Sequence, residues 1–134
     1  MHYTVSMTKI LVVDDTPDAR EFMASILELE RFEVVMAADG LEGIEQARSE
    51  SPDLIITDLT MPRLPGIEMI QKLRSMPEFK SVPILAVTSH GMEKAMDALR
   101  AGANRALARP VENHLLLAFV FDLLANEKKN SHHH

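Results

Sequence analysis

The chain has 134 residues, of which 46% are hydrophobic, and it carries a formal net charge of −6 and no cysteine. This length and composition allow one compact domain, and the lack of cysteine excludes a disulfide framework, a cysteine zinc site and a thiol nucleophile. An acidic chain lacks the basic surface that nucleic acids require, and no stretch approaches the roughly 20 apolar residues of a membrane span. We therefore expect a cytoplasmic protein that binds neither nucleic acid nor membrane.

The first half of the chain alternates strand and helix patterns, beginning with an apolar strand at residues 9–14. Thr16-Pro17 then supplies an N-cap and a first helical residue, and the helix pattern continues to about residue 30. A second strand is predicted over 32–37, and Asp39-Gly40 opens a short helix. Apolar residues at helical spacing are expected to face inward: Ala19, Phe22, Met23 and Ile26 in the first helix, and Leu41, Ile44 and Ala47 in the second.

The second half continues this alternation. A buried strand follows the turn Ser51-Pro52-Asp53 and ends at Asp58, and a helix is predicted over 66–75. Five strand–helix units of this length predict an α/β fold, with helices on both faces of one parallel sheet. The remaining elements are a loop at 77–81, a strand at 83–88, a helix marked by Met92, Ala95, Met96 and Leu99 and closed by Gly102, a strand at 105–108, and a helix from Val111 to about Asn126.

Three acidic side chains stand at the ends of two predicted strands. Asp14 and Asp15 follow the first strand, and Asp58 ends the third. The carboxyl ends of parallel strands share one edge of a sheet, which is where open α/β sheets bind ligands. Carboxylates within ~4 Å repel by ~4 kcal/mol at an effective dielectric constant near 20, so a cation is expected among them. Ligands that are all oxygen favour Mg²⁺.

Each of these polar residues also has an ordinary structural interpretation. Asp14 and Asp15 precede Thr16-Pro17, so they could cap the first helix. Asp58 does not open a helix, because Met61-Pro62 follows it. Taken alone, Thr88 is a strand-end hydroxyl and Arg109 a solvated charge.

Taken together, the positions of these residues resemble the receiver domain of two-component response regulators. The similarity covers residues 8–126 and rests on Asp14-Asp15, on Asp58 with Leu59-Thr60-Met61-Pro62, and on Gly66, Thr88 and Arg109-Pro110. It implies a flavodoxin-like doubly wound sheet of five parallel strands in the order 2-1-3-4-5, with five helices in three layers. It also implies a cis peptide bond between Arg109 and Pro110. Residues 1–7 would then be an N-terminal extension, and residues 127–134 a tail with a His-tag remnant.

The resemblance also implies a function. Asp58 would accept a phosphoryl group from a histidine kinase, a phosphotransfer protein or a small acyl phosphate. Asp15, Asp58 and the backbone carbonyl of Thr60 would bind Mg²⁺ directly, and Asp14 would bind it through water. Thr88 would hydrogen-bond the phosphoryl group, and the chain would catalyse only its own phosphorylation and dephosphorylation.

Three departures from the family pattern leave a second interpretation open. Arg109 replaces a lysine, Ala106 replaces an aromatic residue that moves inward on activation, and Pro65 replaces an aspartate. Because arginine is a planar fork and lysine a point charge, the first exchange is not conservative beside a phosphate. The alternative is therefore a degenerate receiver that acts as a constitutive protein-interaction module. A phospho-aspartyl hydrolase is disfavoured, since Thr60 stands where a second acid would be needed.

The last helix has more apolar residues than one buried face requires. Leu116, Phe119, Val120 and Leu123 form a core stripe, which leaves Leu115, Leu117, Ala118 and Phe121. Such a helix is either deeply buried or covered by another chain. In the family, the helix at 92–102, the strand at 105–108 and the last helix form the usual contact surface. We expect a homodimer, an effector or an output domain to bind there, with a switching surface that includes Thr88, Ala106, Pro110, Leu115 and Phe121.

Overall fold

The computed structural model describes residues 7–131, so the predicted N-terminal extension and tag remnant lie largely outside the described residues. The strands are β1 (Lys9–Val13), β2 (Glu33–Ala37), β3 (Leu54–Asp58), β4 (Ile84–Thr88) and β5 (Arg105–Ala108). The helices are α1 (Pro17–Leu29), α2 (Gly40–Glu50), α3 (Gly66–Arg74), the 3₁₀ turn η1 (Pro77–Phe79), α4 (Gly91–Ala101) and α5 (Asn113–Ser131). Every predicted strand and helix is present, and the largest difference is the later end of α5.

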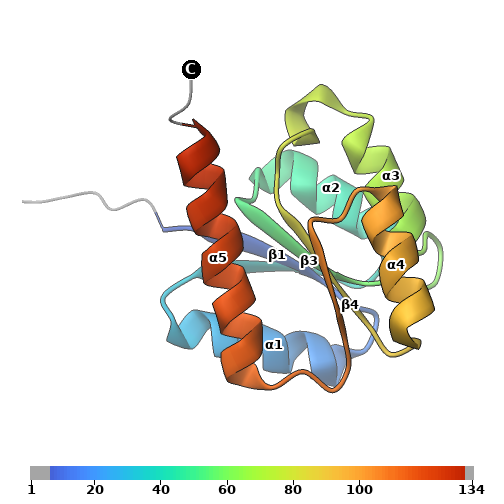
Figure 1. Ribbon diagram of the computed structural model, residues 1–134, viewed down its shortest axis with the longest axis horizontal. Coiled ribbons are helices and arrows are strands. Elements are labelled where there is room, and N and C mark those ends of the chain that lie inside the picture. Colours follow the sequence, from blue (N-terminus) through green and yellow to red (C-terminus); the bar gives the residue numbers. More distant parts are fainter. Residues whose placement is uncertain (1–6, 132–134) are drawn as a thin grey trace, which may run out of the picture.

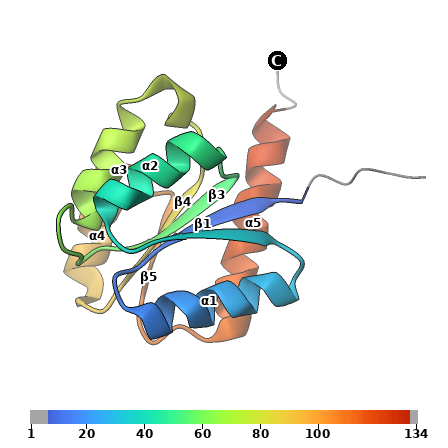
Figure 2. The same ribbon diagram turned by 180° about the vertical axis from the view of Figure 1, so that it is seen from behind.

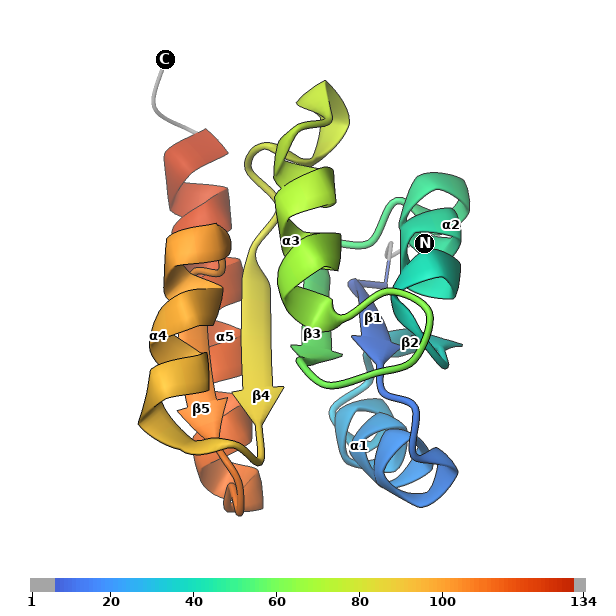
Figure 3. The same cartoon turned by 90° about the vertical axis from the view of Figure 1, so that its right-hand side faces the viewer.

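The five strands form one parallel sheet in the order β2-β1-β3-β4-β5, as predicted. The register pairs Val13 of β1 with Thr57, and Asp58 of β3 with Val87. The strands therefore end at the same edge, and the arrowheads of β1, β3, β4 and β5 point in one direction in Figure 3. We call this the carboxyl edge of the sheet, and the opposite side its amino edge.

Helices cover both faces of the sheet. Helices α1 and α5 lie on one face, and α2, α3 and α4 lie on the other (Figures 1 and 2). Alternate strand residues point to opposite faces, so each strand contributes to two cores. In β3, for example, Ile55 packs toward α3, whereas Leu54 and Ile56 pack with Leu116 and Val120 of α5. Within residues 7–131, no helix is long and apolar enough to cross a membrane.

Several apolar helix residues that were expected inside the protein are exposed. The expectation was wrong for Phe22 of α1 and Leu41 of α2, and on α4 the apolar side chains of Met92, Met96 and Leu99 are exposed as well. Helix α4 instead buries Ala95 and Ala98, and α2 buries Gly40, Gly43 and Ala47. Small residues let a helix approach its neighbours closely, so the longer apolar side chains beside them remain outside the contact.

Candidate functional site

Three carboxylates meet at the carboxyl edge of the sheet, as the sequence predicts. One oxygen from each of Asp14, Asp15 and Asp58 lies within 4.8 Å of the other two. Asp14 is 4% exposed, whereas Asp58 is half-buried and Asp15 is exposed. The Asp14 N–H donates to the carbonyl of Ala37 at 3.0 Å, which extends the pairing of β1 with β2 to the first acid. We refer to these three side chains as the acid cluster.

Asp58 lies in an environment that disfavours its negative charge. Burial raises the pKa of its carboxyl group, and the nearby Asp14 raises it further. The Leu59 N–H, which donates to Asp58 Oδ1 at 2.8 Å, and the Arg109 charge lower this pKa but do not outweigh burial. A cation beside Asp58 would therefore stabilise its charged form.

Asp14 uses both carboxylate oxygens in the described structure. Its Oδ1 accepts from the backbone N–H of Thr16 at 3.0 Å, and its Oδ2 accepts from Arg109 Nη2 at 2.8 Å. The first contact forms a turn that leads into α1 but does not cap the helix, because the N-cap residue is Thr16, which makes no side-chain cap bond. Arg20, which the sequence did not single out, donates to the Asp14 carbonyl at 2.7 Å. Asp14 therefore both orders the start of α1 and completes the acid cluster.

Arg109 is neither solvated nor unpaired. Its side chain is 28% exposed and forms an ion pair with the buried Asp14 carboxylate. Its backbone N–H donates to the carbonyl of Thr88 at 2.8 Å, and the following peptide bond to Pro110 is cis, as predicted. The guanidinium thus lies beside the acid cluster.

Thr88 is fully buried at the end of β4, one residue beyond the partner of Asp58 in the sheet register. Its hydroxyl accepts from the backbone N–H of His90 at 3.0 Å. A hydroxyl that accepts one hydrogen bond still has its own proton to donate. Thr88 can therefore offer a donor at this edge while it holds the start of α4.

The acid cluster fits a hard divalent cation. Ligands on opposite sides of an octahedral Mg²⁺ lie about 4.2 Å apart, so the three oxygens need only small shifts to reach one ion. Three ionised carboxylates and the Arg109 guanidinium together carry two negative charges, which one divalent cation balances. Asp14, Asp15 and Asp58 are therefore suitable ligands, and the carbonyl of Thr60 remains a predicted one.

The loop between β3 and α3 is held by contacts that the sequence did not reveal. Arg63 donates from Nε to Asp39 Oδ2 at 2.8 Å, and its Nη2 lies at the same distance from that oxygen. The Gly40 N–H donates to the carbonyl of Leu64 at 3.1 Å. The Asp39 cap could be read from the sequence: Asp39 Oδ1 accepts from the Glu42 N–H, and Glu42 Oε1 accepts from the N–H of Ala38, the residue before the cap. Its ion pair with Arg63 could not, since the two residues are far apart in the chain.

The residues of the predicted switching surface do not all lie in one patch. Ala106 is half-buried in β5 and pairs with Ala86, while Leu115 is exposed at the start of α5. Phe121 lies elsewhere, because its ring packs against Phe32 with centroids 5.5 Å apart. The turn of α5 that faces β5 instead carries Phe119, whose ring lies 4.3 Å from the Arg105 guanidinium. The placement of Phe121 on the surface of α4, β5 and α5 was therefore wrong.

Comparison with known proteins gives consistent matches. The sequence model of the family described as "Response regulator receiver domain" matches residues 10–121. Hybrid signal transduction histidine kinase D of Dictyostelium discoideum is 40% identical over 120 residues, which make up 89% of this chain and 8% of that protein. Protein PilH of Pseudomonas aeruginosa is 32% identical over 120 residues, or 89% of this chain and 99% of PilH.

Solved structures agree with the sequence relatives. A CheY-like receiver domain protein from Methanospirillum hungatei superposes with a TM-score of 0.87 at 28% identity, and the match covers 93% of this chain and 99% of that one. The chemotaxis response regulator CheY4 of Vibrio cholerae gives a TM-score of 0.82 at 32% identity, over 88% of this chain and 99% of that one.

Proposed function

This chain belongs to the response regulator receiver family, and on that premise we propose that Asp58 accepts a phosphoryl group with Mg²⁺ bound at the acid cluster. The observation that carries this proposal is the meeting of three carboxylate oxygens within 4.8 Å at the carboxyl edge of the sheet. Acids this close need a cation, and Asp58 already disfavours its own charge.

Each residue of the site has a distinct part in the proposed reaction. A carboxylate oxygen of Asp58 attacks the phosphorus atom of the donor. The new O–P bond forms as the bond from phosphorus to the donor nitrogen or oxygen breaks, and the leaving group takes that electron pair. The Thr88 hydroxyl donates a hydrogen bond to a phosphoryl oxygen. Mg²⁺, when bound, neutralises negative charge on the transferring oxygens.

The proposed partners follow from the same chemistry. The donor would be a histidine kinase or a phosphotransfer protein, and the kinase relative that contains a similar segment is consistent with this. On α4, Met92, Met96 and Leu99 are exposed at helical spacing, and Leu115 is exposed on α5. An effector, an output domain or a second copy would bind the apolar side chains of α4 when phosphorylation changes their conformation.

One observation favours the alternative of a constitutive interaction module. Arg109 is committed to Asp14 at 2.8 Å, and a guanidinium that stays there cannot contact the phosphoryl group in the way that the usual lysine would. Phosphorylation could then occur without changing the contact surface. In this alternative, partner binding does not depend on Asp58.

Incubation with acetyl phosphate and Mg²⁺, followed by intact-mass measurement, tests the proposal. We expect the wild type to gain the mass of one phosphoryl group, and the Asp58→Asn variant to gain none. Omission of Mg²⁺ should abolish the gain. Equal labelling of wild type and variant would contradict the assignment of Asp58. Labelling without any change in the amide spectrum of α4, β5 and α5 would favour the constitutive module.

A further inference from the structure

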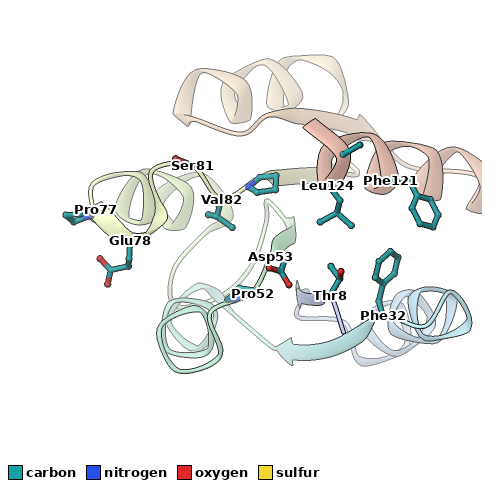
Figure 4. A pocket seen from close by; sticks show the side chains of 12 residues that line it. Thr8, Phe32, Pro52, Asp53, Pro77, Glu78, Ser81, Val82, Phe121 and Leu124 are labelled. Atoms are coloured by element: carbon teal, nitrogen blue, oxygen red, sulfur yellow. The ribbon is translucent and has the colours of Figure 1, made fainter. Parts of the chain in front are cut away.

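A second concave surface lies at the amino edge of the sheet, opposite the acid cluster (Figure 4). Its volume is about 580 Å³. Residues that immediately precede four strands line it, and these are Thr8, Phe32, Asp53 and Pro83. A five-residue strand rises about 16 Å, so this groove is about one strand length from Asp58. We call it the amino-edge groove.

One wall of the amino-edge groove is aromatic. The rings of Phe32 and Phe121 lie 5.5 Å apart at an interplanar angle of 43°, and Leu124 follows on the next turn of α5. Phe121 remains 48% exposed although it packs against Phe32. Pro77 and Val82 line the groove from the segment before β4, and Val82 lies closer to this wall than Pro77 does (Figure 4). The groove is therefore an apolar slot with an incompletely covered aromatic ring.

The charges around the groove have one sign. Among the described residues that line it, the charged side chains are Asp53 and Glu78, and both are exposed. Asp53 also accepts from the backbone N–H of Lys9 at 2.8 Å, which fixes its carboxylate at the mouth of the groove. Both acids lie on the side of the slot away from the aromatic wall, so this acidic rim complements a ligand that joins an apolar side chain to basic residues (Figure 4).

The groove is too open to enclose a small metabolite. Pockets for small molecules bury most of their ligand, whereas half of the residues that line this groove are exposed. An extended chain can place one side chain in the slot and leave its neighbours at the rim. We propose that the amino-edge groove binds a segment of a partner protein in which an aromatic or aliphatic side chain lies next to lysine or arginine residues. The aromatic wall receives the apolar side chain, and Asp53 and Glu78 pair with the basic residues.

This binding does not depend on the proposed phosphorylation of Asp58. The groove and the acid cluster lie at opposite edges of the sheet, so a partner segment can be bound while a kinase occupies the other edge. A receiver that used both surfaces would bring its partner to the donor whether or not it was phosphorylated.

Two synthetic peptides of opposite charge test the proposal, acetyl-KFLK-amide and acetyl-EFLE-amide. Each is titrated into ¹⁵N-labelled protein with saturating Mg²⁺, and the amide shifts are followed. We expect the basic peptide to shift amides of Thr8, Val82 and Leu124. The dissociation constant of the acidic peptide should be larger than that of the basic peptide by a factor of about three or more. Equal affinity for both peptides would overturn the proposal, as would shifts confined to the acid cluster.

Variants separate the aromatic wall from the acidic rim. Phe121→Ser should weaken both peptides, and Glu78→Gln should reduce the difference between them. Phe22→Ser is the matched control, because Phe22 is also an exposed phenylalanine but lies on α1 outside the groove. A loss of binding in the control equal to that in Phe121→Ser would overturn the proposal. Groove amides that shift with protein concentration alone would show that a second copy binds there, which would also overturn it.

Discussion

The guanidinium of Arg109 lies 2.8 Å from the buried carboxylate of Asp14, and this ion pair joins the end of β5 to the end of β1. A buried ion pair adds little net stability when complete, but the loss of one partner leaves an uncompensated charge. The same pair reduces the negative charge that the acid cluster offers to a cation. Arg109 therefore affects both the stability of the protein without metal and its affinity for Mg²⁺.

We predict that Arg109→Met destabilises the metal-free protein by about 3 kcal/mol, because Asp14 stays buried without its cation. The variant should also bind Mg²⁺ more tightly, so that added Mg²⁺ restores more stability to it than to the wild type. Urea unfolding in EDTA and in Mg²⁺ measures both effects. Arg109→Lys keeps the positive charge and should show smaller changes. An equal loss of stability with and without Mg²⁺ would contradict the prediction.

The raised pKa of Asp58 predicts a pH-dependent gain in stability for Asp58→Asn. An unfolded aspartate has a pKa of about 3.9, and burial followed by repulsion from Asp14 raises the pKa of Asp58 in the folded state. Between these two values the folded wild type binds more protons than the unfolded chain. Its stability therefore falls as the pH rises through this interval.

Because asparagine does not titrate, the Asp58→Asn variant should become more stable than the wild type as the pH rises above about 4. The difference should reach its full size above the folded pKa of Asp58, and Mg²⁺ should reduce it. Melting temperatures measured in EDTA from pH 4 to pH 8 test this. A difference that stays constant over the whole range would show that titration of Asp58 is not its source.

Local sequence patterns were sufficient to predict the parallel strands and the acid cluster, whereas the strand order followed from the family resemblance. Apolar runs of strand length ended at Asp14 and Asp58, and the parallel arrangement brought these ends to one edge. The cis peptide bond before Pro110 followed from the family resemblance. The strands and the acid cluster depend on short segments and on rules of chain connection, so one sequence contains the information needed to predict them.

Features that depend on contacts between distant segments were missed. The apolar spacing of α4 predicted the helix, but it did not show that the alanines, and not Met92 and Met96, make the close contact. Phe121 was assigned to the wrong surface because one helix sequence cannot show which neighbour each face meets. Taken singly, Asp39 is interpreted as a helix cap and Arg63 as a surface charge, and only the folded loop shows that they form an ion pair.

The close contact of Gly66 with the end of β3 predicts that adding a single methyl group at this position has a strong effect. A Cβ at this position would lie 2.2 Å from the carbonyl oxygen of Asp58 and 2.8 Å from Leu59 Cα, both of which are backbone atoms. We expect Gly66→Ala to destabilise the protein by about 2 kcal/mol and to weaken Mg²⁺ binding, since the loop after Asp58 must shift.

Gly43→Ala is the matched control for this substitution. Its Cβ would meet the side chains of Met69 and Val13 instead of backbone, and alanine also favours the helix by up to about 1 kcal/mol. We therefore expect a smaller loss of stability and unchanged Mg²⁺ affinity. Urea unfolding and Mg²⁺ titration by calorimetry compare the two variants. Equal Mg²⁺ affinities in both would contradict a role of Gly66 in positioning the loop.

The pair of Asp39 and Arg63 predicts effects that depend on the backbone at Arg63. Arg63 has a φ of 66°, a left-handed conformation that costs a residue with a side chain roughly 1 kcal/mol or more, whereas glycine adopts it freely. Arg63→Ala loses the ion pair and keeps this cost, but Arg63→Gly loses the ion pair and removes the cost. We expect Arg63→Ala to be less stable than Arg63→Gly by about 1 kcal/mol in urea unfolding at pH 7. The reverse order would show that the left-handed backbone at residue 63 does not carry this cost.

Titration of Asp39 should then distinguish the ion pair from the helix cap. Burial tends to raise the pKa of Asp39, but the Glu42 N–H and the Arg63 guanidinium outweigh it, so the folded pKa is lowered. The stability that these contacts provide is complete above the unfolded pKa of about 3.9, and it is lost as the pH falls through the lowered folded value. Arg63→Gly should therefore lose less stability than the wild type on acidification, because only the cap remains to protect the Asp39 charge. Unfolding at pH 7 and at successively lower pH, with Asp39→Asn as the non-titrating control, measures the difference. Identical acid sensitivity of the wild type and Arg63→Gly would assign the lowered pKa to the cap alone.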